Sequence, residues 1–219
     1  MRALTPLEAR VLGVLIEKQA TVPDTYPLSL NALVAGCNQK TARWPVIEAT
    51  DAEVQTAVDG LKSLSLVFDG SSSRVVKYEQ NMAAVTRLPR QSVALLAVLM
   101  LRGPQTSAEL RQNSERLHRF ADISAVEGFL DELAAKEPAR VVRLNRSPGA
   151  REPRWAHLLC GDVPLDTAGS PQRLGEAADG ASVASAELAA LKSEQARMAG
   201  ELAELKALVQ RMARELGVE

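Results

Sequence analysis

The sequence predicts a mainly α-helical protein with small β-hairpins, an α+β fold made of two tandem winged-helix domains and a C-terminal coiled-coil helix. Three amphipathic helices followed by a β-hairpin occur twice along the chain, which is the order of elements in a winged helix. The two copies lie about 75 residues apart. A heptad pattern follows them. We therefore expect winged-helix domains at 1–88 and 89–162, a flexible linker at 163–182 and a coiled-coil helix at 183–219.

Capping residues mark the three helices of the first copy. Thr5 and Glu8 form a capping box at the start of the first helix, which we expect to end within 19–27, a segment with two prolines. Ser29 caps a short second helix, and Thr50 begins a third with another capping box.

The first copy then continues into a hairpin, and the second copy repeats the order. Strands are expected at 66–68 and 75–78, joined by a polar turn. The second copy has a helix at 89–102, a helix capped by Thr106, and a helix at 122–135 capped by Asp122. Its hairpin strands are expected at 141–144 and 155–159.

The C-terminal segment predicts a dimer. Apolar residues separated alternately by three and four positions form the seam of a coiled coil. The expected dimerisation residues are Leu188, Leu191, Met198, Leu202, Leu205, Val209 and Met212. A parallel pair places Glu187 near Lys192 and Glu201 near Lys206 of the partner helix, so we expect a parallel homodimer. The alternative is one amphipathic helix that folds back on its own domains.

The composition limits the classes of function. Only 3% of residues are aromatic, which favours small aliphatic cores between helices. The net charge of −1 excludes a uniformly basic nucleic-acid-binding protein but permits a local basic patch. Apolar runs are too short to span a bilayer, and the first residues lack an apolar secretion segment. We expect a cytoplasmic protein with no membrane partner.

No pattern in the sequence indicates a catalytic or metal site. A Gly-rich phosphate loop, a nucleophile elbow and a paired-histidine zinc helix are all missing. Cys37 and Cys160 are isolated, and His118 and His157 fall in different elements. We expect no enzymatic activity, no metal and no cofactor.

Charge is distributed unevenly over the two copies. Both third helices are acidic, so phosphates would repel the element that usually enters the major groove. Basic residues gather in the second hairpin and in the loop before the first third helix. The candidate nucleic-acid-binding residues are Lys40, Arg43, Arg140, Arg143, Arg146, Arg151 and Arg154. Further arginines follow the second helix of the second copy, at positions 111, 116 and 119.

Two functions of different classes fit these features. The first is a dimeric DNA-binding or regulatory protein that contacts nucleic acid through basic hairpins and loops. The second is a protein-interaction module without direct DNA readout, as in the tandem winged-helix subunits of chromosome-condensing complexes, whose acidic helices face a basic partner. A simpler alternative for the arginines is a solvated hairpin in which they pair with Glu137, Glu152 and other acids.

Short segments in a fixed order add a family resemblance. They are Glu8–Val11, Glu17–Gln19, Tyr26–Asn31, Cys37–Lys40, Lys77–Gln80, Leu101–Gly103 and Val141–Leu144. These segments resemble the YceH family of bacterial proteins. The resemblance implies a tandem winged-helix fold with a C-terminal coiled coil, and it implies no established activity and no catalytic residue. The sequence departs from the family pattern beside Arg43, where Ala42 and Trp44 replace an Asn and an acidic residue.

Overall fold

The computed structural model describes residues 2–70, 75–146 and 152–163. The chain divides into two units, 1–174 and 175–219, and all described residues belong to the first. The described part is α+β, with helices and small antiparallel sheets. No helix in these ranges is long and apolar enough to cross a membrane. The seven predicted dimerisation residues, from Leu188 to Met212, lie outside the described ranges.

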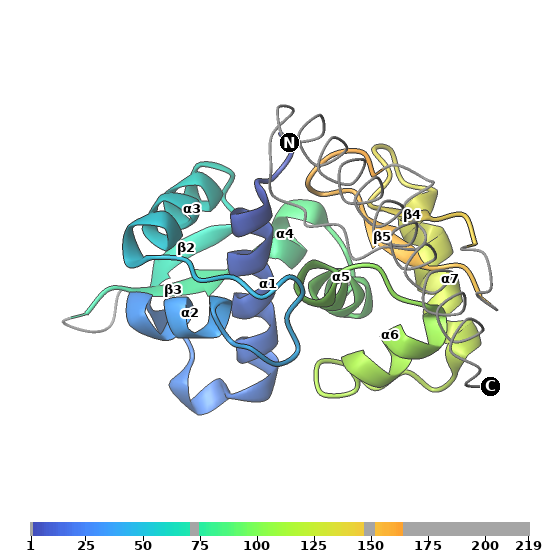
Figure 1. Cartoon of the computed structure of the whole chain (residues 1–219), viewed down its shortest axis with the longest axis horizontal. Coiled ribbons are helices and arrows are strands. Elements are labelled where there is room, and N and C mark those ends of the chain that lie inside the picture. The colour runs from blue at the N-terminus through green and yellow to red at the C-terminus, as the bar shows by residue number, and fades with distance from the viewer. Residues whose placement is uncertain (1, 71–74, 147–151, 164–219) are drawn as a thin grey trace, which may run out of the picture. The chain divides into compact units, whose positions relative to one another are not determined.

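The first half of this unit holds three helices and a three-stranded sheet (Figure 1). The helices are α1 (Pro6–Thr21), α2 (Leu30–Cys37) and α3 (Asp51–Ser63), with a short 3-10 helix at Pro23–Thr25. The strands are β1 (Leu28–Ser29), β2 (Val67–Gly70) and β3 (Lys77–Gln80). They form an antiparallel sheet in the order β1-β3-β2.

The second half repeats this order of elements after the short helix α4 (Met82–Thr86). It contains α5 (Arg90–Arg102), α6 (Ser107–Ser114), α7 (Ile123–Ala134), β4 (Val141–Arg143) and β5 (Trp155–His157). The strands β4 and β5 pair antiparallel. Gln105, between α5 and α6, bridges to Trp155 through two backbone hydrogen bonds and so occupies the place of β1 in the first half.

The predicted helix caps are confirmed. Complete capping boxes begin α1, α3 and α6, and the side chains of Ser29 and Asp122 cap α2 and α7. Each capping side chain accepts a backbone N–H that the first helical turn leaves without an intrahelical partner. Local sequence therefore determines where these helices start.

The end of α1 agrees with the prediction, whereas a strand boundary does not. Helix α1 ends at Thr21, inside the predicted segment 19–27, and the hydroxyl of Thr21 donates to the Glu17 carbonyl at 2.9 Å. The second strand of the first hairpin lies at Lys77–Gln80, not at 75–78. Tyr78 sets this register, because its ring is buried and its hydroxyl donates to Gln55 of α3 at 2.8 Å. A shift of one residue would turn the ring to solvent.

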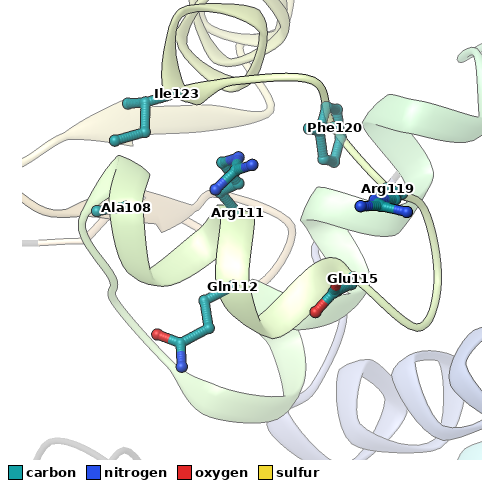
Figure 2. Close-up of a pocket in the computed structure, with 7 residues that line it drawn as sticks. All are labelled: Ala108, Arg111, Gln112, Glu115, Arg119, Phe120 and Ile123. Carbon is teal, nitrogen blue, oxygen red and sulfur yellow. The ribbon is translucent and has the colours of Figure 1, made fainter.

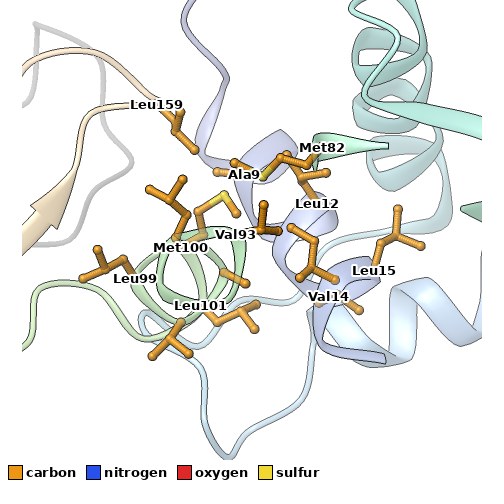
Figure 3. Packing of buried hydrophobic residues seen from close by; sticks show 14 of the residues in the cluster. Ala9, Leu12, Val14, Leu15, Met82, Val93, Leu99, Met100, Leu101 and Leu159 are labelled. Atoms are coloured by element: carbon orange, nitrogen blue, oxygen red, sulfur yellow. The ribbon is translucent and has the colours of Figure 1, made fainter. Parts of the chain in front are cut away.

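The two halves share one continuous hydrophobic core (Figure 3). Helix α1 packs directly against α5, so the first helices of the two copies lie side by side. Gly13 permits this approach, since a Cβ atom there would lie 3.0 Å from the side chain of Leu101. Backbone hydrogen bonds also join the halves, from Leu4 to Leu159 and from Trp44 to Leu101, both at 2.8 Å.

The α1–α5 contact generates a stability prediction. Gly13→Val places two methyl groups in a gap that Leu101 already limits, so we expect the free energy of unfolding to fall by about 2 kcal/mol. The matched control is Gly128→Val on α7, where a Cβ atom meets nothing within 4 Å. That variant should change stability by no more than about 0.5 kcal/mol. Urea unfolding of the three proteins measures the difference, and equal stabilities would contradict close packing at Gly13.

Candidate nucleic-acid interface

The seven candidate basic residues occupy different environments. Arg143, Arg146, Arg154 and Lys40 are exposed, and Arg140 is half-buried. Arg43 is buried and Arg151 lies outside the described residues. The structure therefore gathers exposed cations on and beside the second hairpin, with Lys40 separate from them in the first half.

Arg43 lies inside the first half. Its guanidinium forms an ion pair with Glu17 and donates to Glu17 Oε1 at 3.1 Å. Its Nε donates to the carbonyl of Gly36, in the last turn of α2, at 3.0 Å. No face of this guanidinium is left for a phosphate, so Arg43 does not belong to the exposed basic surface.

A second buried arginine, which the sequence analysis missed, supports the same loop. Arg10 of α1 donates to the carbonyls of Cys37 at 3.0 Å and Pro45 at 2.6 Å. Burial, followed by the positive charge of Arg43, lowers the pKa of Arg10 from its usual range. Arg10 and Arg43 thus satisfy carbonyls at the C-terminus of α2, where the helix dipole favours positive charge. Asn38 also fixes the loop by two hydrogen bonds to the backbone of Ala49, each 2.8 Å.

The buried ion pair leads to a second stability prediction. Glu17→Gln removes the carboxylate that compensates Arg43, whose side chain has no solvent exposure, and we expect a loss of about 3 kcal/mol in unfolding free energy. The control is Lys62→Gln, which breaks the exposed pair between Lys62 and Asp69 at 2.7 Å. That change should cost about 1 kcal/mol or less. Equal losses in chemical denaturation would rule out a special role for the Glu17–Arg43 pair.

Arg143, Arg146 and Arg154 of the second hairpin are exposed and make few contacts among the described residues. Arg143 lies over the ring of Trp155, with 5.9 Å between its Cζ atom and the ring centroid. Arg154 is 3.8 Å from Glu109 and donates to the carbonyl of Pro104 at 3.4 Å. Within the described ranges neither Arg143 nor Arg146 forms an ion pair.

Among the described residues, one arginine of this hairpin, Arg154, lies against an acid, Glu109. Glu137 and Glu152 are exposed, and in the part of the chain that the structure describes neither is paired with an arginine. The contact between Arg154 and Glu109 is solvent-exposed on both sides, which makes it weak. Positive charge on this hairpin is therefore only partly neutralised by the protein itself.

The exposed faces of the third helices carry the opposite charge. On α3 the exposed acids are Asp51, Glu53 and Asp59. On α7 they are Glu127, Asp131 and Glu132, together with the capping residue Asp122. In the second half, α7 thus carries exposed negative charge, and the hairpin that follows it carries exposed positive charge.

The chain can be placed among known proteins by sequence. The model of a family described as "Protein of unknown function, DUF480" matches residues 4–150, which include most of both halves. The chain belongs to the DUF480 family. A UPF0502 protein of Burkholderia multivorans and one of Burkholderia vietnamiensis are each 65% identical to the chain over its whole length and 92% of theirs. A relative from Burkholderia cenocepacia is 63% identical with the same coverage. These matches confirm the resemblance to the YceH family.

Other titratable groups in this family member are held neutral by burial. Burial raises the pKa of Cys37 to about 12 and that of Cys160 to about 11, so both thiols stay protonated at neutral pH. Burial lowers the pKa of His157 on β5 to about 4, and its Nδ1 atom has no hydrogen-bond partner. No group of three His, Cys, Asp or Glu side chains with metal-binding geometry occurs among the described residues.

The buried imidazole generates a pH prediction. The folded-state pKa of His157, about 4, lies below the ordinary value of 6.5, so the unfolded chain takes up the proton first as the pH falls. The contribution of His157 to the free energy of unfolding should be constant above its ordinary pKa and fall by about 2 kcal/mol between pH 7 and pH 5. The variant His157→Gln should lose this part of the slope, whereas His118→Gln should retain it. Urea titrations at several pH values test this, and identical slopes for all three proteins would refute it.

Proposed function

We propose that this protein is a dimeric, non-enzymatic winged-helix protein that binds duplex DNA through the basic hairpin of its second half. The observation that carries the proposal is the set of exposed arginines on β4 and its flanks, of which Arg143 and Arg146 have no carboxylate partner in the described ranges. Phosphate contacts from Lys and Arg supply much of the affinity of proteins for DNA.

The order of elements supports a winged helix in each half. Three helices are followed by an antiparallel hairpin in both, and a short segment after the first helix adds to each sheet, as Leu28–Ser29 and as Gln105. In a winged helix the hairpin is the wing, which contacts the DNA backbone or the minor groove. Arg143 and Arg146 lie at the end of the first wing strand and just beyond it.

Charge supports the wing over the third helix as the contact. The exposed face of α7 has three acids, the capping residue Asp122 adds a fourth, and α7 contains no lysine or arginine, so moving it into a groove would bring carboxylates towards phosphates. The arginines of the hairpin have the sign that phosphates require. We therefore propose backbone or minor-groove contact by the wing, without reading of bases by α7.

A salt titration tests the DNA proposal. Arg143→Gln/Arg146→Gln should weaken binding to a duplex of arbitrary sequence and reduce the slope of log K against log salt by about 2, because two phosphate contacts are lost. The control, Arg87→Gln/Arg90→Gln, removes the same charge from two exposed residues, Arg87 at the end of α4 and Arg90 at the start of α5, and should leave the slope unchanged. Fluorescence anisotropy with a labelled duplex measures both. Absence of binding at low salt, or equal slopes for the two variants, would overturn the proposal.

A second candidate function rests on the acidic helices. The exposed acids of α3 and α7 form surfaces suited to a basic protein partner, as expected for an interaction module of the kind found in chromosome-condensing complexes. Substitution of Glu127 and Asp131 by Gln and Asn should weaken such a partner's binding and leave DNA binding intact or stronger. The two functions therefore respond to different variants.

The proposed dimer depends on the C-terminal heptads. A chain ended after Asp162 keeps the shared core of the two halves and lacks all seven proposed seam residues, from Leu188 to Met212. We expect the full chain to have the mass of a dimer in light scattering and the shortened chain that of a monomer. If light scattering gave the same number of chains per particle for both proteins, the C-terminal segment would not be what holds the dimer together.

A further inference from the structure

A pocket opens in the second half between α6 and the start of α7 (Figure 2). Its volume is about 290 Å³, near the lower end of the range for small-molecule sites. The side chains that line it are Ala108, Arg111, Gln112, Glu115, Arg119, Phe120 and Ile123. The size therefore suits a compound with a single ring or a short chain.

The polar part of the lining carries a net positive charge. Arg111 and Arg119 contribute two guanidinium groups, and Glu115 contributes one carboxylate. Neither arginine forms an ion pair within the described ranges. Arg111 donates to the carbonyl of Ala121 at 3.2 Å, which holds its guanidinium at the connection to α7. A single negative charge on a ligand would balance this lining, and Gln112 offers a further amide donor.

The rest of the lining is apolar, and its aromatic ring packs against neighbouring rings. Ile123 is 43% exposed although it begins a helix in a folded core, and it faces the pocket. Phe120 is buried beneath the connection, with edge contacts to His118 at 4.7 Å and Phe129 at 5.8 Å between ring centroids. In Figure 2 Ile123 and Phe120 lie on two sides of the Arg111 guanidinium. An apolar surface next to two cations suits a ligand that has both an acid group and a flat hydrocarbon part.

The corresponding connection in the first half holds its arginine differently. There the connection from α2 to α3 places its arginine, Arg43, in the interior, where Glu17 neutralises it and Asn38 fastens the loop. In the second half Arg119 occupies the corresponding connection, from α6 to α7, but is exposed and unpaired. The two copies thus differ in the state of this arginine. Arg43 is neutralised by Glu17, whereas Arg119 has no ion pair among the described residues and is available to a ligand.

We propose that this pocket binds a small organic monoanion with a flat apolar body, an aromatic carboxylate being the simplest example. The carboxylate lies between Arg111 and Arg119, which can hold it through planar, charge-assisted hydrogen bonds. The ring packs on Ile123 and the edge of Phe120. Glu115 disfavours ligands of higher negative charge, such as a phosphate dianion. The site is distinct from the arginines of the second hairpin, and its ligand needs no DNA to bind.

Binding of benzoate to the full-length protein tests the inference. We expect a dissociation constant on the order of 1 mM, measured by calorimetry or by ligand-observed NMR. Arg111→Gln and Arg119→Gln should each weaken binding about tenfold, because each removes one charge-assisted contact. The matched control is Arg116→Gln, an exposed arginine of the same connection that does not line the pocket, and its affinity should stay within about twofold.

Three comparison compounds separate the parts of the proposal. Benzyl alcohol lacks the charge, acetate lacks the ring and inorganic phosphate replaces the acid group, so each should bind more weakly than benzoate. Tight binding of phosphate would show a general anion site and overturn the ligand class. No benzoate binding, or equal losses in Arg116→Gln and Arg111→Gln, would overturn the site itself. Neither result bears on DNA binding by the hairpin, which is measured without these compounds.

Discussion

The packing of α1 against α5 is the contact on which the rest of the described structure depends. Each helix is the first of its copy, and in both nearly all of the side chains along the middle are buried. A helix in a small domain usually buries one face and leaves the other to water. Here the second face of each helix is covered by the other copy, which explains why 92–101 is buried throughout. Close contact requires small residues, at Gly13 and at Gly103, where φ is +72° and a Cβ would lie 2.5 Å from the Trp44 ring.

Arginine serves two purposes in this fold, and burial distinguishes them. Arg10 and Arg43 satisfy carbonyls of a loop and a helix end, and they are shielded from solvent. Arg111, Arg119, Arg143 and Arg146 are exposed, without partners that would neutralise them in the described ranges. Sequence position alone does not separate the groups, because each includes a helix residue, Arg10 on α1 and Arg111 on α6, as well as residues outside helices. What separates them is whether the folded chain encloses the guanidinium with acceptors, which are backbone carbonyls for Arg10 and Glu17 with a carbonyl for Arg43.

Local signals in the sequence predicted most of the fold, and non-local contacts account for what they missed. The starts of α1, α3 and α6 depend on side chains three residues apart, so they could be predicted closely. The register of the first hairpin depends on Tyr78 meeting Gln55, which no local pattern contains. The interior place of Arg43 depends likewise on Glu17, and the basic hairpin was recognisable because its arginines are close in sequence.

The shared core also bears on how the chain folds. Leu12 and Leu96, equivalent residues of the two copies, belong to the same buried cluster, so neither copy encloses a complete core by itself. Cutting the connection near Asn81 would leave each piece with an apolar helix face open to water. The described unit should therefore melt in one cooperative step rather than in two. The two copies in this way form a single folding unit, in which a destabilising substitution in one copy lowers the stability of both.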